Sequence, residues 1–286
     1  MPSNNPNALV SSQWLDSHIN DSNLKLIDAS WYLPNMQRDA YAEYRQSHIA
    51  GALFFDIDKI CDQTSQLPHM APSVETFSAC LSALGIGAED QVVVYDGAGL
   101  FSAARVWWLF KLMGLDRVAV LDGGLPKWNT EGRKTDNVIT QVEMSGTFNC
   151  VQRPILKNAI QVLAATQSKA YGIVDARAPG RFQGLEPEPR EGLRSGHIPG
   201  SKNLFFKTLL QSDQTMKSPE ELRSCFLAAG INMSQPLITT CGSGVTAAIL
   251  NLGLTLIGQQ DHFLYDGSWT EWGMDPTLPM ETGQHH

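Results

Sequence analysis

Five short segments from the first half of the chain return in the second half, in the same order and at offsets of 144 to 149 residues. Such self-similarity at one period indicates a duplicated domain, so the fold must be one that each half can adopt. We predict a first domain at residues 8–135, a linker at residues 136–157 and a second domain at residues 158–280. The matching pairs are Leu26–Ala29 with Ile173–Ala176, His48–Gly51 with His197–Gly200, Leu84–Ile86 with Ala229–Ile231, Asp96 with Cys241, and Asp122 and Trp128 with Asp266 and Trp272.

Within each half, short apolar runs alternate with segments of helical periodicity. This alternation predicts an α/β fold, in which each domain is a mostly parallel sheet flanked by helices on both faces. The second half also contains a capping box, formed by Ser218 and Glu221 with Pro219 at the first helical position. In the first half we expect strands at about residues 24–29, 92–95 and 118–121 and helices at about residues 73–84 and 102–113.

One cysteine of the second domain lies between a predicted strand and a predicted helix. Leu237 to Thr240 form a short apolar run, and apolar residues at helical spacing follow from Val245 to Leu256, with Cys241 between them. Gly242 and Gly244 can take positive φ and let the loop curl around the sulfur. The positive end of the helix dipole favours a thiolate there. An isolated cysteine is more often a core residue, but this context favours a nucleophile.

The first domain has Asp96 where the second has Cys241, so we expect only the second to carry a nucleophile. In parallel sheets, sites form at the carboxyl ends of the strands, where both residues lie. For Asp96 we expect the role of a helix cap, and for the first domain that of a scaffold that lends residues to the second. Cys80 and Cys225 take equivalent places in two helices, which indicates core packing.

Composition narrows the class of protein. A chain of 286 residues with 43% hydrophobic residues can form two domains, each with its own core. The net charge of −8, without a run of Lys and Arg, excludes nucleic acid as a main partner. The five cysteines lack C-x-x-C spacing, so we expect neither a disulfide framework nor a zinc site. Residues 1–7 lack a leader pattern and residues 245–257 are too short to span a bilayer, so we expect a cytoplasmic protein without a membrane partner. His285 and His286 are tag-like and are left out.

In the cysteine loop and in eight further motifs, the chain resembles the two-domain rhodanese family of sulfurtransferases. The loop CGSGVTA from Cys241 to Ala247 is similar to that of the family's 3-mercaptopyruvate sulfurtransferases. The resemblance extends over nearly the whole chain. The motifs that carry it are DASWYLP (28–34), FFDID (54–58), LPHM (67–70), FSAARVWW (101–108), GRFQG (180–184), EPEPREG (186–192), GHIPGS (196–201) and YDGSWTEWG (265–273).

The resemblance implies a fold of two tandem rhodanese-like domains and a specific reaction. Sulfane sulfur passes from 3-mercaptopyruvate, which leaves as pyruvate, to a persulfide on Cys241, and from there to a thiol, to cyanide or to a small thioredoxin-like redox protein. We expect no metal and no cofactor. The family places two arginines at the positions of Arg181 and Arg190, which are suited to clamp the carboxylate of the donor. The loop residues Gly242, Gly244, Val245 and Thr246 are expected to line the substrate site.

The resemblance also implies a proton relay. In this family, a serine two residues after the cysteine is coupled to a histidine and an aspartate of the first domain, which correspond by motif to Ser243, His69 and Asp58. These side chains also have ordinary explanations, since His69 lies in a proline-flanked loop and Asp58 can cap a turn. For His197 we expect a structural role, because its copy His48 lies in the half without a nucleophile.

Three other functions compete with this one. A phosphatase loop of the type C-x5-R needs an arginine six residues after the cysteine, where this chain has Ala247, so that class is nearly excluded. Thiosulfate-preferring members of the family carry basic residues just after the cysteine, where this chain has Gly242 and Ser243. A thiosulfate sulfurtransferase is nevertheless the closest alternative. A protein that only binds or senses sulfur on the same fold is the third.

Overall fold

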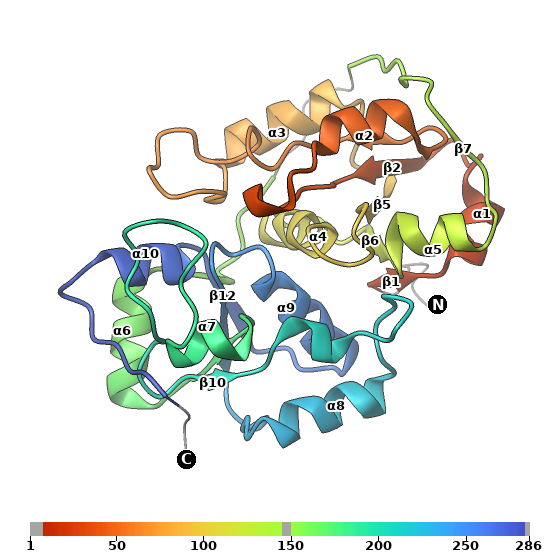
Figure 1. Cartoon of the computed structure of the whole chain (residues 1–286). Coiled ribbons are helices and arrows are strands. Elements are labelled where there is room, and N and C mark those ends of the chain that lie inside the picture. Colours follow the sequence, from red (N-terminus) through yellow and green to blue (C-terminus); the bar gives the residue numbers. More distant parts are fainter. Residues whose placement is uncertain (1–7, 145–149, 284–286) are drawn as a thin grey trace. The chain divides into compact units, whose positions relative to one another are not determined.

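The computed structural model describes residues 8–144 and 150–283, and its chain divides into two compact units (Figure 1). The first unit contains Met1–Gln63, Ala71–Pro154 and Ser212–Thr215, and the second contains Thr64–Met70, Ile155–Gln211 and Met216–His286. Residues 1–7, the middle of the predicted linker (145–149), and His285 and His286 lie outside the described residues, and with them the predictions made there. Among the residues that are described, no helix combines the length and apolar character needed to cross a bilayer.

The sheet of the first unit is entirely parallel. In spatial order its strands are β1 (Leu9–Val10), β6 (Val118–Leu121), β5 (Gln91–Tyr95), β2 (Leu24–Asp28) and β4 (Leu53–Phe54). A separate antiparallel pair joins β3 (His48–Ile49) to β7 (Thr135–Asp136). The helices are α1 (Ser12–His18), α2 (Ala40–Gln46), α3 (Val74–Ala83), α4 (Ala103–Leu112) and α5 (Gly124–Thr130), with a 3-10 turn η1 at Pro34–Met36.

The sheet of the second unit repeats this strand order and is also parallel. From the edge equivalent to β1, its strands are β8 (Leu156–Lys157), β12 (His262–Tyr265), β11 (Leu237–Thr240), β9 (Gly172–Asp175) and β10 (Lys202–Asn203). The helices are α6 (Ala159–Ser168), α7 (Pro179–Gln183), α8 (Pro219–Ala228), α9 (Ala247–Leu256) and α10 (Ser268–Met274), with a 3-10 turn η2 at Phe206–Leu209. Two sheets with one strand order confirm the predicted fold class and the duplication.

The strands and helices expected from the sequence are present within two residues of their predicted ends, and the largest difference is at α9, which begins at Ala247 rather than at Val245. Ser73 caps α3 by accepting a hydrogen bond from the backbone N–H of Thr76. The capping box at α8 forms as predicted, with the Ser218 hydroxyl bound to the Glu221 N–H and the Glu221 carboxylate bound to the Ser218 N–H. These helix starts are predictable because their capping contacts are local in sequence.

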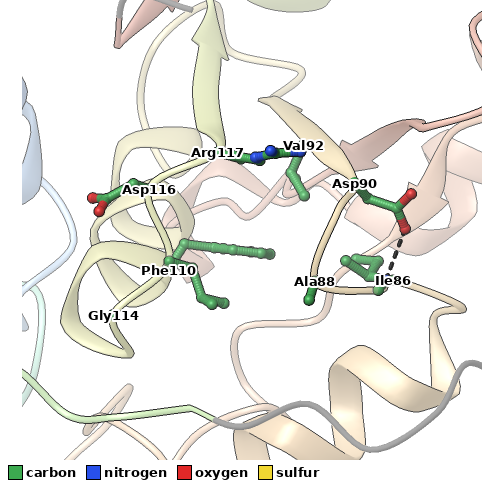
Figure 2. Close-up of a pocket in the computed structure, with 10 residues that line it drawn as sticks. Ile86, Ala88, Asp90, Val92, Phe110, Gly114, Asp116 and Arg117 are labelled. Carbon is green, nitrogen blue, oxygen red and sulfur yellow. Dashed lines mark hydrogen bonds between the residues drawn. The ribbon is translucent and has the colours of Figure 1, made fainter. Parts of the chain in front are cut away.

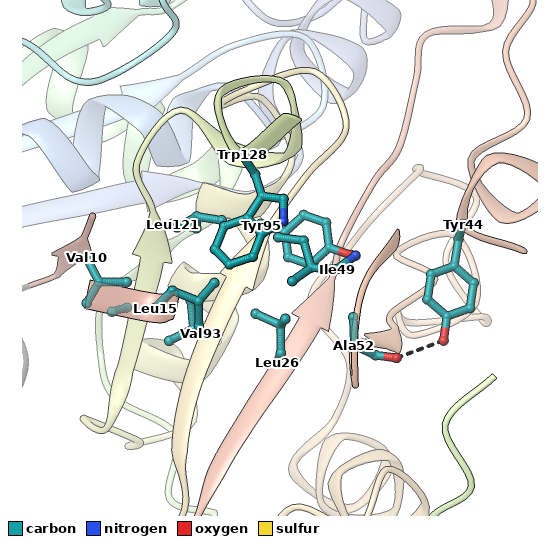
Figure 3. Close-up of a cluster of buried hydrophobic side chains, with 11 residues drawn as sticks. Val10, Leu15, Leu26, Tyr44, Ile49, Ala52, Val93, Tyr95, Leu121 and Trp128 are labelled. Carbon is teal, nitrogen blue, oxygen red and sulfur yellow. Dashed lines mark hydrogen bonds between the residues drawn. The ribbon is translucent and has the colours of Figure 1, made fainter. Parts of the chain in front are cut away.

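Alternating side chains divide the strands of the first unit between two faces. Leu26, Val93 and Leu121, from three neighbouring strands, pack on one face against Leu15 of α1 and Trp128 of α5 (Figure 3). Each of these side chains is buried, which stabilises the fold by roughly 1.5–3 kcal/mol per aliphatic side chain. The opposite face of β5 and β6 is covered by α4. Packing on both faces therefore fixes the carboxyl ends of these strands in the sheet.

The repeated histidines are packing residues in both units. His48 is buried and stacks on Tyr44, whose carbonyl lies 2.6 Å from the His48 Nδ1. His197 is buried in the same way and stacks on Phe182, whose carbonyl lies 2.7 Å from the His197 Nδ1. The same environment in the copy without a cysteine supports the structural role expected for His197.

The two units differ at one buried aspartate. Asp175 ends β9 and is paired with Arg177, whereas its copy Asp28 ends β2 and accepts hydrogen bonds from the N–H and hydroxyl of Ser30. Burial raises the pKa of Asp28 from 3.8 to about 6, against the hydrogen bonds of Ser30, which lower it. The folded state thus favours the protonated form. The stabilising contribution of the protonated Asp28 is complete when the pH is below the ordinary pKa of 3.8, and it is lost as the pH rises through about 6.

We therefore expect Asp28→Asn, which is neutral at every pH, to stabilise the protein in a pH-dependent way. The gain in unfolding free energy should be up to about 3 kcal/mol at pH 7.5 and about half of that at pH 5, because the wild type progressively recovers its proton. Urea unfolding followed by circular dichroism at both pH values measures it. An equal gain at the two pH values would contradict the assignment of a buried Asp28 that is ionised near neutrality.

Candidate active site

Cys241 follows the central strand of the second sheet. All four residues of β11 are buried, and Cys241 itself is only 2% exposed. The loop continues to Thr246, which is the N-cap residue of α9 and gives no side-chain cap to that helix. The thiol thus lies at the carboxyl end of a strand and just before a helix N-terminus, as the sequence predicts.

The two glycines of this loop serve different purposes. Gly244 has φ +74°, a conformation that side chains rarely adopt, so the turn depends on it. Gly242 is not in that region, and the expectation of positive φ at this position is wrong. Its hydrogen instead leaves room for a neighbour, because a Cβ there would lie 3.1 Å from the Nη2 of Arg181. Gly242 therefore allows a guanidinium to approach the backbone beside the thiol.

The hydroxyl of Ser268 ties the cysteine loop to the start of α10. It accepts hydrogen bonds from the backbone N–H of Cys241 (3.2 Å) and of Gly244 (3.1 Å), and it donates to the carbonyl of Tyr265 (2.8 Å). Ser268 is fully buried and has φ +50°, so its backbone is constrained at the same point. Its copy in the first unit is Gly124, which has no hydroxyl. The tie thus belongs to the unit that carries the thiol.

The next two residues of α10 bind the carbonyl groups of the loop. The backbone N–H of Trp269 donates to the Cys241 carbonyl at 2.9 Å. Thr270 donates to the Gly242 carbonyl with both its N–H (2.9 Å) and its hydroxyl (2.7 Å). Ser268 and Thr270 were not predicted as site residues, although the motif YDGSWTEWG contains both. Their role depends on α10 folding back onto the loop, which no local pattern indicates.

A chain of buried charges leads to the edge of this loop. Arg177 is bound by Asp175 and by Glu188, and the second carboxylate oxygen of Glu188 accepts from Arg181, with 2.5 Å between Oε2 and Nη2. Arg181 is the last and most exposed of these charged residues, with 20% of its side chain exposed. The structure therefore places this predicted arginine beside Gly242 and couples it to an acid that the sequence reasoning did not single out.

The structure also brings together two of the three predicted relay residues. His69 is buried, and its Nδ1 lies 3.2 Å from the hydroxyl of Ser243. The segment that contains His69, Thr64–Met70, belongs to the second unit, and His69 adopts φ +61° there. Asp58 belongs to the first unit, in an exposed turn, where its carboxylate accepts from the indole N–H of Trp31 at 3.0 Å. A link from Asp58 to His69 stays a prediction.

Arg190 lies half-buried in the irregular segment after α7. Val245 is buried and Thr246 is half-buried, both at the start of α9. The structure fixes the positions of these residues, and their expected contacts with a donor molecule stay predictions.

The matching loop of the first unit is filled by its own side chains. Asp96 is fully buried, and one oxygen of its carboxylate accepts from three successive backbone N–H groups at the start of α4, at 2.7 to 2.9 Å. Its other oxygen accepts from the N–H of Ala98. A Cβ at Gly97 would collide with the hydroxyl of Tyr32. Asp96 thus caps α4 as expected, although the N-cap position itself is held by Ser102. In the first unit, the backbone N–H groups at the helix start are therefore already bound by the carboxylate of Asp96.

Two cavities of the first unit lie away from that loop. Figure 2 shows one of about 220 Å³, lined among others by Asp90, Phe110 and Arg117. It borders the amino end of β5, whereas Asp96 follows its carboxyl end. A second cavity, of about 350 Å³, is lined by Leu24 to Leu26 and by residues 140–143. Neither includes a predicted site residue. Within residues 8–144 and 150–283, no cluster of His, Cys, Asp and Glu is arranged to hold a metal ion.

Comparison with known proteins identifies the class to which this fold and loop belong. The Rhodanese-like domain family matches residues 11–131 and again residues 158–275. The chain is a member of the rhodanese family, with two tandem domains.

The chain is similar to sulfurtransferases over most of their length. The chain is 43% identical to the 3-mercaptopyruvate sulfurtransferase of Homo sapiens, over 93% of this chain and 92% of the relative. It is 45% identical to thiosulfate/3-mercaptopyruvate sulfurtransferase 2 of Arabidopsis thaliana, over 95% and 86%. Among solved structures, a 3-mercaptopyruvate sulfotransferase from Escherichia coli superposes with a TM-score of 0.84 at 36% identity, over 92% of this chain and 99% of that one.

The Ser268 tie leads to a stability prediction. We expect Ser268→Ala to destabilise the protein by about 1–3 kcal/mol for each buried N–H that loses its acceptor, and to lower turnover by the loosened loop. Ser268→Gly also removes the hydroxyl but accommodates φ +50° without a side chain. Both variants should unfold at lower urea than wild type in tryptophan fluorescence, with Gly less affected than Ala. An Ala variant as stable as wild type would show that the hydroxyl is dispensable.

Proposed function

We propose that this protein transfers sulfane sulfur from 3-mercaptopyruvate to an acceptor through a persulfide on Cys241, releasing pyruvate. The observation that carries the proposal is the cysteine loop itself. A single thiol follows the central strand, its loop is tied down by Ser268, and an arginine lies against Gly242. The high identity to 3-mercaptopyruvate sulfurtransferases over nearly the full chain supports the choice of donor.

The first half-reaction moves one sulfur atom. The Cys241 thiolate attacks the sulfur of 3-mercaptopyruvate, a new S–S bond forms, and the C–S bond breaks with its electron pair left on carbon. The leaving fragment is the enolate of pyruvate, which takes up a proton. The thiol proton of the donor, now on the outer sulfur, balances that uptake when the persulfide ionises. Backbone N–H groups at the helix N-terminus then stabilise the anionic persulfide.

Arg181 and Arg190 are assigned to the carboxylate of the donor. A guanidinium binds a carboxylate through two parallel hydrogen bonds, which orients the donor as well as holding it. Arg181 is supported by its place beside Gly242. Arg190 is supported by its motif position, and its own side chain is half-buried. Gly242, Gly244, Val245 and Thr246 form the wall of the substrate site in this proposal.

Ser243, His69 and Asp58 are assigned to proton transfer. The 3.2 Å approach of the His69 Nδ1 to the Ser243 hydroxyl supports the first step of such a relay. The hydroxyl, two residues after the nucleophile, can donate to the carbonyl or thiol group of the donor, and His69 can return the proton. Asp58 orients His69 in this proposal.

Thiosulfate is the competing donor. A thiosulfate sulfurtransferase of Cricetulus griseus is 44% identical to this chain, over 93% of this chain and 91% of the relative. Positions 242 and 243 hold Gly and Ser, so the loop itself offers a dianion no cation. We therefore rank thiosulfate second. Thiol, cyanide and thioredoxin-like acceptors, and a cytoplasmic location, stay predictions.

The direct test is turnover of 3-mercaptopyruvate by wild type and by Cys241→Ser. We expect steady pyruvate release from wild type with a thiol acceptor, a mass gain of one sulfur atom when donor is added without acceptor, and neither in the variant. Cys80→Ser, at a cysteine of α3 that the mechanism does not use, is the matched control and should keep both. A protein that only binds sulfur would show the adduct without turnover, and a variant that still turns over would rule out Cys241 as nucleophile.

The His69–Ser243 contact predicts coupled effects on turnover. If the two side chains act as one relay, the double change His69→Ala with Ser243→Ala should lower kcat/KM little more than the worse single change. Measurement of kcat/KM with 3-mercaptopyruvate for all four proteins completes the cycle. Fully additive losses would mean that the two residues act independently.

A further inference from the structure

Four charged side chains form one connected group at the edge of the cysteine loop, and their charges sum to zero. They are Asp175, Arg177, Glu188 and Arg181, and all but the last are at most 2% exposed. Glu188 is the link between the two arginines, with its Oε1 2.7 Å from Arg177 and its Oε2 2.5 Å from Arg181. The charge that a ligand meets at this edge therefore depends on Glu188 as much as on Arg181.

The inner end of this group is immobilised. Arg177 donates to both oxygens of Asp175, to the carbonyl of Gly196 at 2.8 Å and to Glu188, and its guanidinium stacks 4.4 Å from the ring centroid of Trp269. Burial lowers the pKa of Arg177, but Asp175 and Glu188 outweigh it and raise the pKa above the ordinary value. A permanently charged, fixed Arg177 holds one oxygen of Glu188 and so aims the other at Arg181.

The outer end keeps donors available. Arg181 uses its Nε and Nη2 on a single oxygen of Glu188. Within the described residues its Nη1 donates to no protein acceptor, and its Nη2 is the atom nearest to a Cβ built on Gly242. Arg181 can thus bind an anion beside the thiol through its Nη1 while the carboxylate of Glu188 balances its charge.

The group is confined to the unit that has the thiol. The first unit has Ser30 where the second has Arg177, so Asp28 lacks the buried guanidinium that anchors the acid in the second unit. An arrangement needed only to stabilise the fold would be expected in both copies. At the matching glycine, Gly97, the first unit places the neutral hydroxyl of Tyr32, which is bound by Arg38 and Glu43, so a guanidinium at the edge of the loop is particular to the second unit.

We propose that Glu188 is a specificity-determining residue, which holds Arg181 beside Gly242 and cancels its charge so that the site favours a monoanionic donor over a dianionic one. This inference rests on the proposed function, because it concerns the choice between 3-mercaptopyruvate, with one carboxylate, and thiosulfate, with two negative charges. With Glu188 ionised the group is neutral, and hydrogen-bond geometry selects the carboxylate. Without that charge the group becomes cationic, and the dianion gains more from it than the monoanion.

The experiment compares Glu188→Gln with Glu186→Gln. Glutamine keeps the shape and an acceptor oxygen but removes the charge, and Glu186 is an exposed acid of the same segment that makes no hydrogen bond to Arg181 among the described residues. With one acceptor, kcat and KM are measured for both donors. We expect the ratio of kcat/KM for thiosulfate to that for 3-mercaptopyruvate to rise about fivefold to tenfold in Glu188→Gln, mainly through KM, and to stay within about twofold in Glu186→Gln.

Glu188→Asp separates charge from geometry. Aspartate keeps the charge but is too short to span both arginines, so we expect lower activity with both donors and an unchanged donor ratio. The proposal is overturned if Glu188→Gln lowers both donors equally, or if Glu188→Asp shifts the ratio as Glu188→Gln does. Should Glu188→Gln not fold, Glu188→Ala takes its place, since it also removes the charge and must raise the ratio, while Glu188→Asp must leave it unchanged. Wild type that releases no pyruvate from 3-mercaptopyruvate would refute the proposed function instead, a result seen before any variant is compared.

Discussion

The hydrogen bonds between α10 and the cysteine loop are the constraint on which the rest of the site depends. A loop between a parallel strand and a helix has many conformations, and its backbone groups are costly to bury unless they are paired. Here Ser268 accepts from two N–H groups of the loop, and Thr270 and Trp269 bind its carbonyls. These bonds constrain the path of the backbone around Cys241 and hold the loop at the end of the central strand.

The duplicated unit shows what such a loop does with an anion. In the first unit a carboxylate from Asp96 receives the N–H groups at the start of α4, and Tyr32 lies against Gly97. The same strand-to-helix geometry in the second unit has a small, neutral or singly charged sulfur in that position and an arginine in place of the tyrosine. One copy is therefore closed by its own side chain, and the other is left to accept a ligand. A persulfide, which is anionic and one atom longer than the thiolate, suits the second arrangement.

Local patterns predicted the scaffold well, because the information lies within a few residues. Strands such as β11 are short apolar runs, and α8 begins at a capping box whose partners are three residues apart. The duplication was visible because both copies keep the same packing residues, His48 and His197 among them. Cys241 was identifiable for a similar reason, since strand, cysteine, glycines and helix follow each other directly. The need for glycine at position 242 was not identifiable, because it arises from contact with the side chain of Arg181, which is distant in sequence.

The class of fold, the order of elements in both halves and the one thiol at a strand end follow from the amino-acid sequence, because each depends on periodicity, turn chemistry or repetition. The tertiary structure alone decided how that thiol is surrounded. Ser268 and Thr270 reach the loop from α10, and Glu188 acts on its edge through Arg181. These segments are distant from the loop along the chain, and side chains that meet only after folding leave no periodic signal. For the same reason, the distance between His69 and Ser243, which are 174 residues apart in sequence, is known only from the folded structure.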